Sequence, residues 1–224
     1  MTARTLEPEW LDSLPERDAR ALRSRRDLVR VNALMGNASI VAGMLQPLPS
    51  RALRIAEIGA GDGAFAARVV RRLGGHGEIV LVDRGARPAA AVERDLSPRG
   101  WRVAGAHADI FEWLAASGPF DAIFANLFLH HFDDAAIGRM LRAVAARTPL
   151  FVACEPRRSR VGLAGAHLLG LVGCNDVTRH DAVVSVRAGF AGSEIGALWP
   201  ADIAARIDEG SRGAFSHGFR ARPG

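Results

Sequence analysis

The stretch Glu57-Ile58-Gly59-Ala60-Gly61-Asp62-Gly63 decides the fold of this chain. It follows an apolar run from Leu53 that is typical of a buried strand, and it precedes a helix-forming segment over residues 64–73. Glycines at such a junction let the backbone turn tightly and approach a ligand, with the helix N–H groups facing it. The same letters fit the dinucleotide fingerprint GxGxxA if Ala64 is its last position, so the turn alone leaves the ligand open.

Strands and helices alternate beyond this turn. Strands that alternate with helices form a parallel, doubly wound sheet covered on both faces. Further on, helices at residues 161–172 and 178–188 follow one another, with Thr178 and Asp181 in the spacing of a capping box. A crossover needs only one helix, so the second indicates a lid over the strand ends. The other predicted strands are residues 78–82, 102–108, 120–125, 149–154, 204–208 and 214–221, and the other helices are residues 89–96, 134–147 and 193–199.

Acidic side chains stand at the ends of the first three predicted strands. Glu57 lies where a carboxylate can hold an ammonium group, and Asp83 lies where an acid takes two ribose hydroxyls. Asp109 ends the third strand, where an acid can accept a hydrogen bond from an exocyclic adenine amine. Ligands of such sheets bind beyond these strand ends, so the three acids together predict one nucleoside site.

The motifs ExGxGxG, Asp83, Ala108-Asp109 and Phe120–Asn126 together resemble those of class I S-adenosylmethionine-dependent methyltransferases over residues 53–155. The resemblance implies an α/β, Rossmann-like doubly wound sheet of seven strands in the order 3-2-1-4-5-7-6, the last antiparallel. It implies an N-terminal helical cap over residues 1–50 and a methyltransferase domain over residues 51–224, with a helical insertion at 157–199. Residues 178–199 also resemble bacterial methyltransferases of secondary metabolism.

The same resemblance implies a cofactor, S-adenosyl-L-methionine, and its product S-adenosyl-L-homocysteine. Carried over position by position, it assigns the cofactor contacts by the part of the molecule that each residue faces. These are Glu57 at the methionine ammonium, Gly59, Ala60, Gly61 and Gly63 along the methionine and ribose, Asp83 on the ribose diol, Arg84 beside adenine, Asp109 and Ile110 at the adenine edge, and Asn126 and Leu127 at the methionine end. Residues 32–37 could also touch the cofactor.

Two histidines, His130 and His131, follow the fourth predicted strand, and several small-molecule methyltransferases have a similar Leu-His-His stretch there. Methyl transfer needs an in-line nucleophile, and a hydroxyl acceptor must also lose its proton, which suits a histidine near pH 7. We favour His131 as this base, with His130 or His180 as the alternatives. Glu155 ends the neighbouring fifth strand, where it could orient or charge-stabilise one of the two adjacent histidines.

The charge pattern argues against a nucleic-acid partner. The chain carries 29 basic and 24 acidic residues, and no segment concentrates the excess as a phosphate-binding arm does. The stretch at residues 126–129 also differs from the Asn-Pro-Pro-aromatic sequence of enzymes that methylate DNA and RNA amines. Residues 157–160, Arg-Arg-Ser-Arg, are expected to form a solvated loop that could attract an anion.

We find no signal peptide and no apolar stretch of bilayer length, and we expect a cytoplasmic protein with no metal site. The expected reaction is O-methylation of a phenolic or polyketide-like small molecule by direct displacement. Three alternatives remain: C-methylation of a quinone precursor, an NAD(P)-dependent oxidoreductase that uses the GxGxxA pattern, and a non-catalytic cofactor-binding partner subunit. The sequence leaves open whether the protein is a homodimer.

Overall fold

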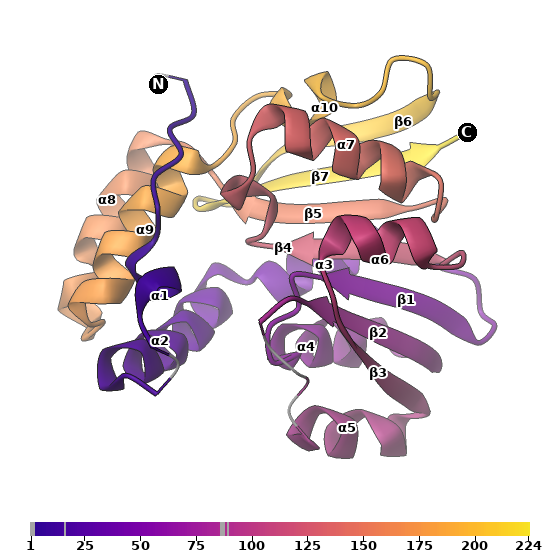
Figure 1. The fold of residues 1–224 in the computed structure, drawn as a ribbon, viewed down its shortest axis with the longest axis horizontal. Coiled ribbons are helices and arrows are strands. Elements are labelled where there is room, and N and C mark those ends of the chain that lie inside the picture. The colour runs from indigo at the N-terminus through magenta and orange to yellow at the C-terminus, as the bar shows by residue number, and fades with distance from the viewer. Residues whose placement is uncertain (1–2, 16, 86–87, 89) are drawn as a thin grey trace.

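The computed structural model describes residues 3–15, 17–85, 88 and 90–224. Its centre is one sheet in the order β3-β2-β1-β4-β5-β7-β6, and β7 runs antiparallel to both of its neighbours (Figure 1). This confirms the strand order and the antiparallel last strand that the sequence implied. The strands are β1 (Leu53–Ile58), β2 (Gly77–Asp83), β3 (Trp101–His107), β4 (Ala122–Asn126), β5 (Phe151–Pro156), β6 (Ala205–Arg212) and β7 (Ser216–Pro223).

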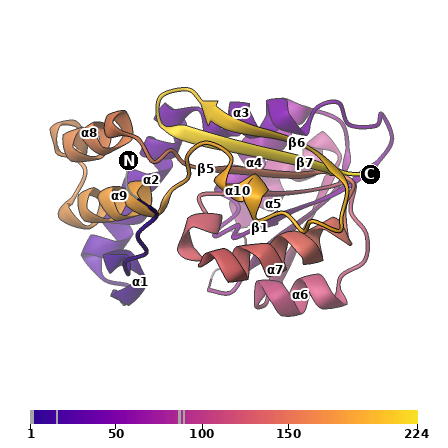
Figure 2. The ribbon, with the colours of Figure 1, turned by 90° about the horizontal axis from the view of Figure 1, so that it is seen from above.

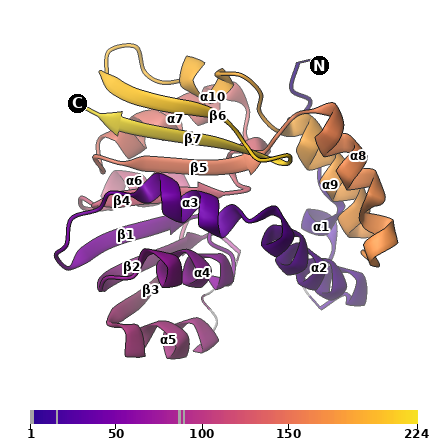
Figure 3. The ribbon, with the colours of Figure 1, turned by 180° about the vertical axis from the view of Figure 1, so that it is seen from behind.

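Helices cover both faces of the sheet, as Figures 2 and 3 show. Successive strand side chains point to opposite faces, so β1 sends Ile55 into one core and Ile58 into the other. The first core lies under α3 (Asn37–Leu45), α4 (Ala64–Leu73) and α5 (Ala90–Leu96), and the second lies under α6 (Ile110–Ala116), α7 (Asp134–Ala145) and the short α10 (Glu194–Ala197). Residue 89, the expected start of α5, lies outside the described residues.

A separate group of helices lies beyond the carboxyl ends of β1, β4 and β5 (Figure 1). Buried polar contacts join two of its members: Thr178 donates to Ser24 over 2.9 Å, and Asp27 accepts from the backbone N–H of Asn175 over 2.8 Å. These contacts fix the group as one body at the end of the sheet. Its members are α1 (Trp10–Ser13), α2 (Ala19–Met35), α8 (Arg160–Leu168), the 3₁₀ turn η3 (Leu169–Val172) and α9 (Asp176–Ala188).

The start of α9 differs from the sequence prediction. Asn175 caps the helix by accepting from the Thr178 N–H over 2.9 Å, so the helix begins before Thr178. Asp181, predicted to complete a capping box, instead accepts from the backbone N–H groups of Trp10 and Leu11 over 2.8 and 3.0 Å. A carboxylate binds any free N–H group within reach, and here the N-terminal segment supplies two.

No single helix in the described part of the chain is both long and apolar enough to cross a membrane. The bent pair α2 and α3 meets the criteria of length and composition taken together, with 57° between the two helices. Within that pair, α3 packs into the core of the sheet through Val41 and Leu45, both fully buried.

Candidate active site

The turn between β1 and α4 has the strained geometry that its glycines predict. Gly59, Gly61 and Gly63 all have positive φ, between 54° and 81°. A Cβ atom on Gly59 would lie 2.2 Å from the ring of Phe128, so this position excludes a side chain on two grounds. The turn therefore brings the backbone of β1 against the segment that follows β4.

A cavity of about 830 Å³ opens at the carboxyl ends of the strands. Its walls combine the glycine turn, the ends of β2 and β4, and a segment from the N-terminus, residues 6–9 and Asp12. Most of the candidate side chains predicted from sequence meet here. Those lining the cavity are Gly59, Asp83, Arg84, Asp109, Ile110, Leu127, His130 and His131.

Asp83 and Asp109, the acids predicted to bind a nucleoside, both border the cavity at the carboxyl ends of β2 and β3. Asp83 accepts from the Gly61 N–H and the Gly85 N–H, each over 2.8 Å, which ties the end of β2 to the glycine turn. Asp109 caps α6 by accepting from the Phe111 N–H over 2.9 Å. Both carboxylates border the cavity, and each oxygen can accept a further hydrogen bond.

Glu57 lies behind the cavity wall, fully buried, and burial raises the pKa of its carboxyl well above the usual range. Among the described residues its Oε2 atom finds no hydrogen-bond partner, and neither does the buried Oδ1 atom of Asn32. Buried polar atoms normally have partners, so two orphaned acceptors fit a ligand that brings donors, such as an α-ammonium group.

Asn126 also lies outside the cavity wall. Its side-chain oxygen accepts from the Asn37 amide over 2.9 Å, and Asn37 accepts from Ser216 over 2.6 Å, so α3, β4 and β7 are joined under the site. Ala60, Gly61 and Gly63 shape the turn without lining the cavity.

Glu155 at the end of β5 organises the turn that carries the two histidines. Its Oε1 atom accepts from the N–H groups of Phe128 and Leu129 over 3.1 and 2.9 Å, and its Oε2 atom lies 2.8 Å from Nδ1 of His130. Just before these residues, Leu127 has a φ of 51°, which is rare outside glycine and marks a turn held under strain. The Glu155 carboxylate thus holds both the loop and one imidazole.

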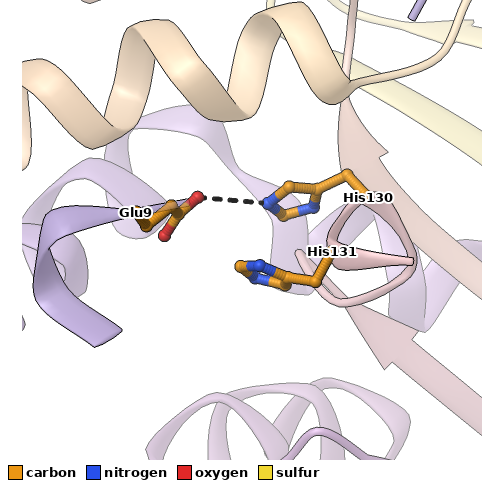
Figure 4. A group of neighbouring side chains, drawn as sticks. All are labelled: Glu9, His130 and His131. Carbon is orange, nitrogen blue, oxygen red and sulfur yellow. Dashed lines mark ion pairs between the residues drawn. The ribbon is translucent and has the colours of Figure 1, made fainter. Parts of the chain in front are cut away.

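His130 and His131 lie side by side with ring centres 4.2 Å apart and planes tilted by 34°, and Glu9 faces them from the N-terminal segment (Figure 4). Burial alone would lower the pKa of His130. The hydrogen bond to Glu155 and the nearby carboxylate of Glu9, which lies 3.6 Å from Nε2, outweigh the effect of burial and raise the pKa of His130 to about 9. Burial and the charge of His130 lower the pKa of His131. The two shifts run in opposite directions, so the site favours the charged form of His130 and the neutral form of His131.

The donor atoms of Glu9, His130 and His131 lie within 4.8 Å of one another, a spacing that could hold a metal ion. The charges in the cluster already account for this grouping, because His130 lies between two carboxylates, Glu9 and Glu155.

His180, the other candidate base, does not line the cavity. Its ring stacks on Trp10 with centres 3.8 Å apart, and its Nδ1 atom lies 3.0 Å from Asp181. The structure therefore brings His131, and not His180, to the end of β4 where the other candidates meet.

Sequence reasoning missed the N-terminal strap, which we define as residues 4–13. The strap crosses α9: Arg4 donates to the carbonyl of Ala188 over 2.8 Å, and Ser185 donates to the Glu9 carboxylate. Leu6, Glu7, Pro8, Glu9 and Asp12 line the cavity. The strap has no periodic pattern, and its contacts are with residues far along the chain, so no local signal marks it.

Comparison with known proteins bears on this site. Residues 55–148 match a family model described as a methyltransferase domain. A solved structure of the plantazolicin methyltransferase BpumL with SAH is similar over 95% of this chain and 92% of that chain, at 10% identity and a TM-score of 0.65. No protein in a curated set matches the chain.

Two further solved structures are similar but come from longer chains. The mitomycin 7-O-methyltransferase MmcR matches 95% of this chain at 21% identity and a TM-score of 0.59. A putative O-methyltransferase from Nostoc punctiforme PCC 73102 matches 89% at 16% identity and a TM-score of 0.62. The chain covers 60% and 59% of those two chains, respectively.

The sheet order, the glycine turn and the matched domain point to the same class of protein. Residues 55–148 match a methyltransferase domain, and the sheet has the strand order that the resemblance to class I S-adenosylmethionine-dependent methyltransferases implied. The match to a methyltransferase domain favours S-adenosylmethionine over NAD(P) as the ligand of the glycine turn.

Proposed function

We propose that the protein transfers a methyl group to the hydroxyl of a phenolic or polyketide-like small molecule, with His131 as general base. The observation that carries this proposal is the position of His131 in the cavity wall beside His130, which contacts both Glu155 and Glu9. A base must be deprotonated at working pH, and the imidazolium of His130 keeps its neighbour in that form.

The chain's own residues would hold the cofactor, S-adenosylmethionine, which supplies an electrophilic methyl group. Asp83 would accept from the ribose diol, and Arg84, Asp109 and Ile110 would border adenine. Glu57, with its orphaned oxygen, would take the methionine ammonium. Gly59 and Leu127 would approach the methionine part, because both line the cavity near the end of β4.

Three groups divide the work at the acceptor. Glu155 would position His130 through the 2.8 Å contact at Nδ1, and His130 would hold His131 neutral. His131 would then accept the hydroxyl proton as the oxygen attacks the methyl carbon. Residues 1–50 and 157–199 would act as a cap and a lid that exclude water, since the strap and α9 both border the cavity.

Carbon methylation of a quinone precursor is the second candidate. An activated ring carbon also loses a proton during methylation, so the same base supports it. The named O-methyltransferases among the similar structures favour oxygen as the first candidate.

The test uses methyl-labelled S-adenosylmethionine and pairs of phenols with their O-methyl ethers. We expect label on the free phenols, as a methyl ether by NMR, and none on compounds whose hydroxyl is blocked. Label on a ring carbon would favour the second candidate. Transfer to blocked compounds at equal rates would contradict the role of a hydroxyl acceptor.

A further inference from the structure

The outer face of α8 and η3 is exposed and apolar. Side chains at helical spacing point to solvent, and Leu171 is 83% exposed. From Val161 to Gly173 the sequence has no charged residue, and His167 is its one titratable side chain. We define the α8 face by its four exposed members: Val161, Leu168, Leu171 and Val172.

Neither a core helix nor a membrane span explains the α8 face. The segment Arg160–Val172 is a short apolar helix, well below the roughly 20 residues that cross a bilayer. Its inner side already packs on α9, with Gly162 and Ala166 buried, so the exposed leucines are not needed for that contact. Exposed apolar residues that gather at one place usually mark an interaction surface.

Arginines surround the α8 face. Arg160 begins α8 and is exposed, Arg23 donates to the carbonyl of Gly173 over 3.1 Å, and Arg179 lies against Gly170 of η3. None of the three forms an ion pair with an acid in the described part of the chain. The nearest acid along the chain, Asp176, is paired with Arg20.

We propose that the α8 face docks on the surface of an anionic lipid bilayer. Its leucines would enter the boundary between headgroups and acyl chains, and the arginines would meet lipid phosphates, as in interfacial amphipathic helices. A second copy of this chain fits less well, because a two-fold contact sets each patch against itself and would bring arginine against arginine. This proposal does not depend on the acceptor.

Co-sedimentation with phosphatidylcholine vesicles, with or without phosphatidylglycerol, tests the proposal. We expect binding to the anionic vesicles and much weaker binding to the neutral ones. Leu171→Glu should weaken binding roughly tenfold or more, since it removes an exposed leucine that would enter the bilayer. Arg160→Gln and Arg179→Gln should each weaken it about fivefold. Leu34→Glu is the matched control, because Leu34 is 77% exposed on α2, outside the α8 face.

Each other outcome overturns the proposal. Absence of binding to anionic vesicles excludes the lipid surface directly. Equal losses for Leu171→Glu and Leu34→Glu would mean that the α8 face has no special role. A dimer that Leu171→Glu dissociates, with no vesicle binding, would assign the face to a second copy. Binding of S-adenosylhomocysteine by each variant shows whether its fold is intact.

Discussion

The cavity has two walls that the chain builds differently. The proposed cofactor wall comprises the glycine turn with Asp83, Asp109 and Ile110, and the proposed acceptor wall comprises the strap, the α9 residues Val184 and Ala188, and His131. The cofactor wall joins neighbours in sequence: the Asp83 contact with Gly61 spans 22 residues. The acceptor wall joins the two ends of the helical group: the Asp181 contact with Trp10 spans 171 residues. The cofactor wall is part of the sheet, whereas the acceptor wall depends on the strap staying bound to α9. Substitutions in the two walls should therefore have separable effects on cofactor affinity and on acceptor turnover.

The largest expected effect is that of His131→Ala. Loss of a general base lowers kcat by about 10²- to 10⁴-fold, while S-adenosylhomocysteine affinity stays unchanged. Steady-state kinetics and calorimetry measure the two quantities. His180→Ala is the comparison, because His180 stacks on Trp10 outside the cavity, and its kcat should stay near that of the unmodified protein. Equal losses in both variants would contradict the assignment of the base.

Asp83→Asn should have the opposite effect to His131→Ala, because it should change the cofactor affinity rather than kcat. It removes a charged acceptor from the cofactor wall, and hydrogen bonds to charged groups predict about 10- to 100-fold weaker S-adenosylhomocysteine binding. Calorimetry measures this, with Asp95→Asn on α5 as a control, since Asp95 pairs only with arginines away from the cavity. Unchanged affinity would remove Asp83 from the site.

The activity should follow a bell-shaped pH profile. The pKa of His131 is lowered, so the rate should stay level near pH 7 and fall about tenfold per unit only below its pKa, under 6.5. Glu9, Asp12 and Glu155 face this ring and oppose the shift in part. On the alkaline side the rate should fall as His130 loses its proton near pH 9 and releases Glu9. An acid limb at or above pH 6.5 would contradict a neutral His131.

Asp181→Ala tests the acceptor wall. It removes the acceptor for two strap N–H groups, so we expect the KM for the acceptor to rise about tenfold with little change in cofactor affinity. Asp176→Ala is the matched control, because Asp176 lies on the same helix and pairs with exposed Arg20. An equal rise in the acceptor KM of Asp176→Ala would point to a general loss of stability of α9 and would contradict a specific role for Asp181.

The smallest expected effect is that of a chelator. The cluster of Glu9, His130 and His131 balances its charges internally, so dialysis against EDTA should leave kcat and the acceptor KM unchanged. Activity that disappears on dialysis and returns with a divalent cation would assign the cluster to a metal instead.

The cofactor wall could be predicted from sequence because its signals are local. An apolar run, three glycines and an acid at each strand end are enough to locate Glu57, Asp83 and Asp109. The acceptor wall could not be predicted in this way. The sequence pattern predicts Asp181 as part of a helix cap, because a carboxylate accepts equally from any N–H group, and only the folded chain shows that the strap supplies the N–H groups.

The two adjacent histidines also show what sequence alone cannot predict. His130 and His131 are the same residue type in neighbouring positions, and sequence alone favours neither strongly. The difference arises because Glu155 reaches Nδ1 of His130 and not the ring of its neighbour. Glu155 and Glu9 together raise the pKa of His130, whereas burial and the charge of His130 lower the pKa of His131.

The strap also has a consequence for the order of folding. It precedes every strand of the sheet in the chain, yet its contact between Arg4 and Ala188 spans 184 residues. The strands from β1 to β4 can pair while synthesis continues, but the strap's contacts with α9 cannot form until α9 has been made. Attachment of the strap is thus a late event in folding, after the cofactor wall has formed.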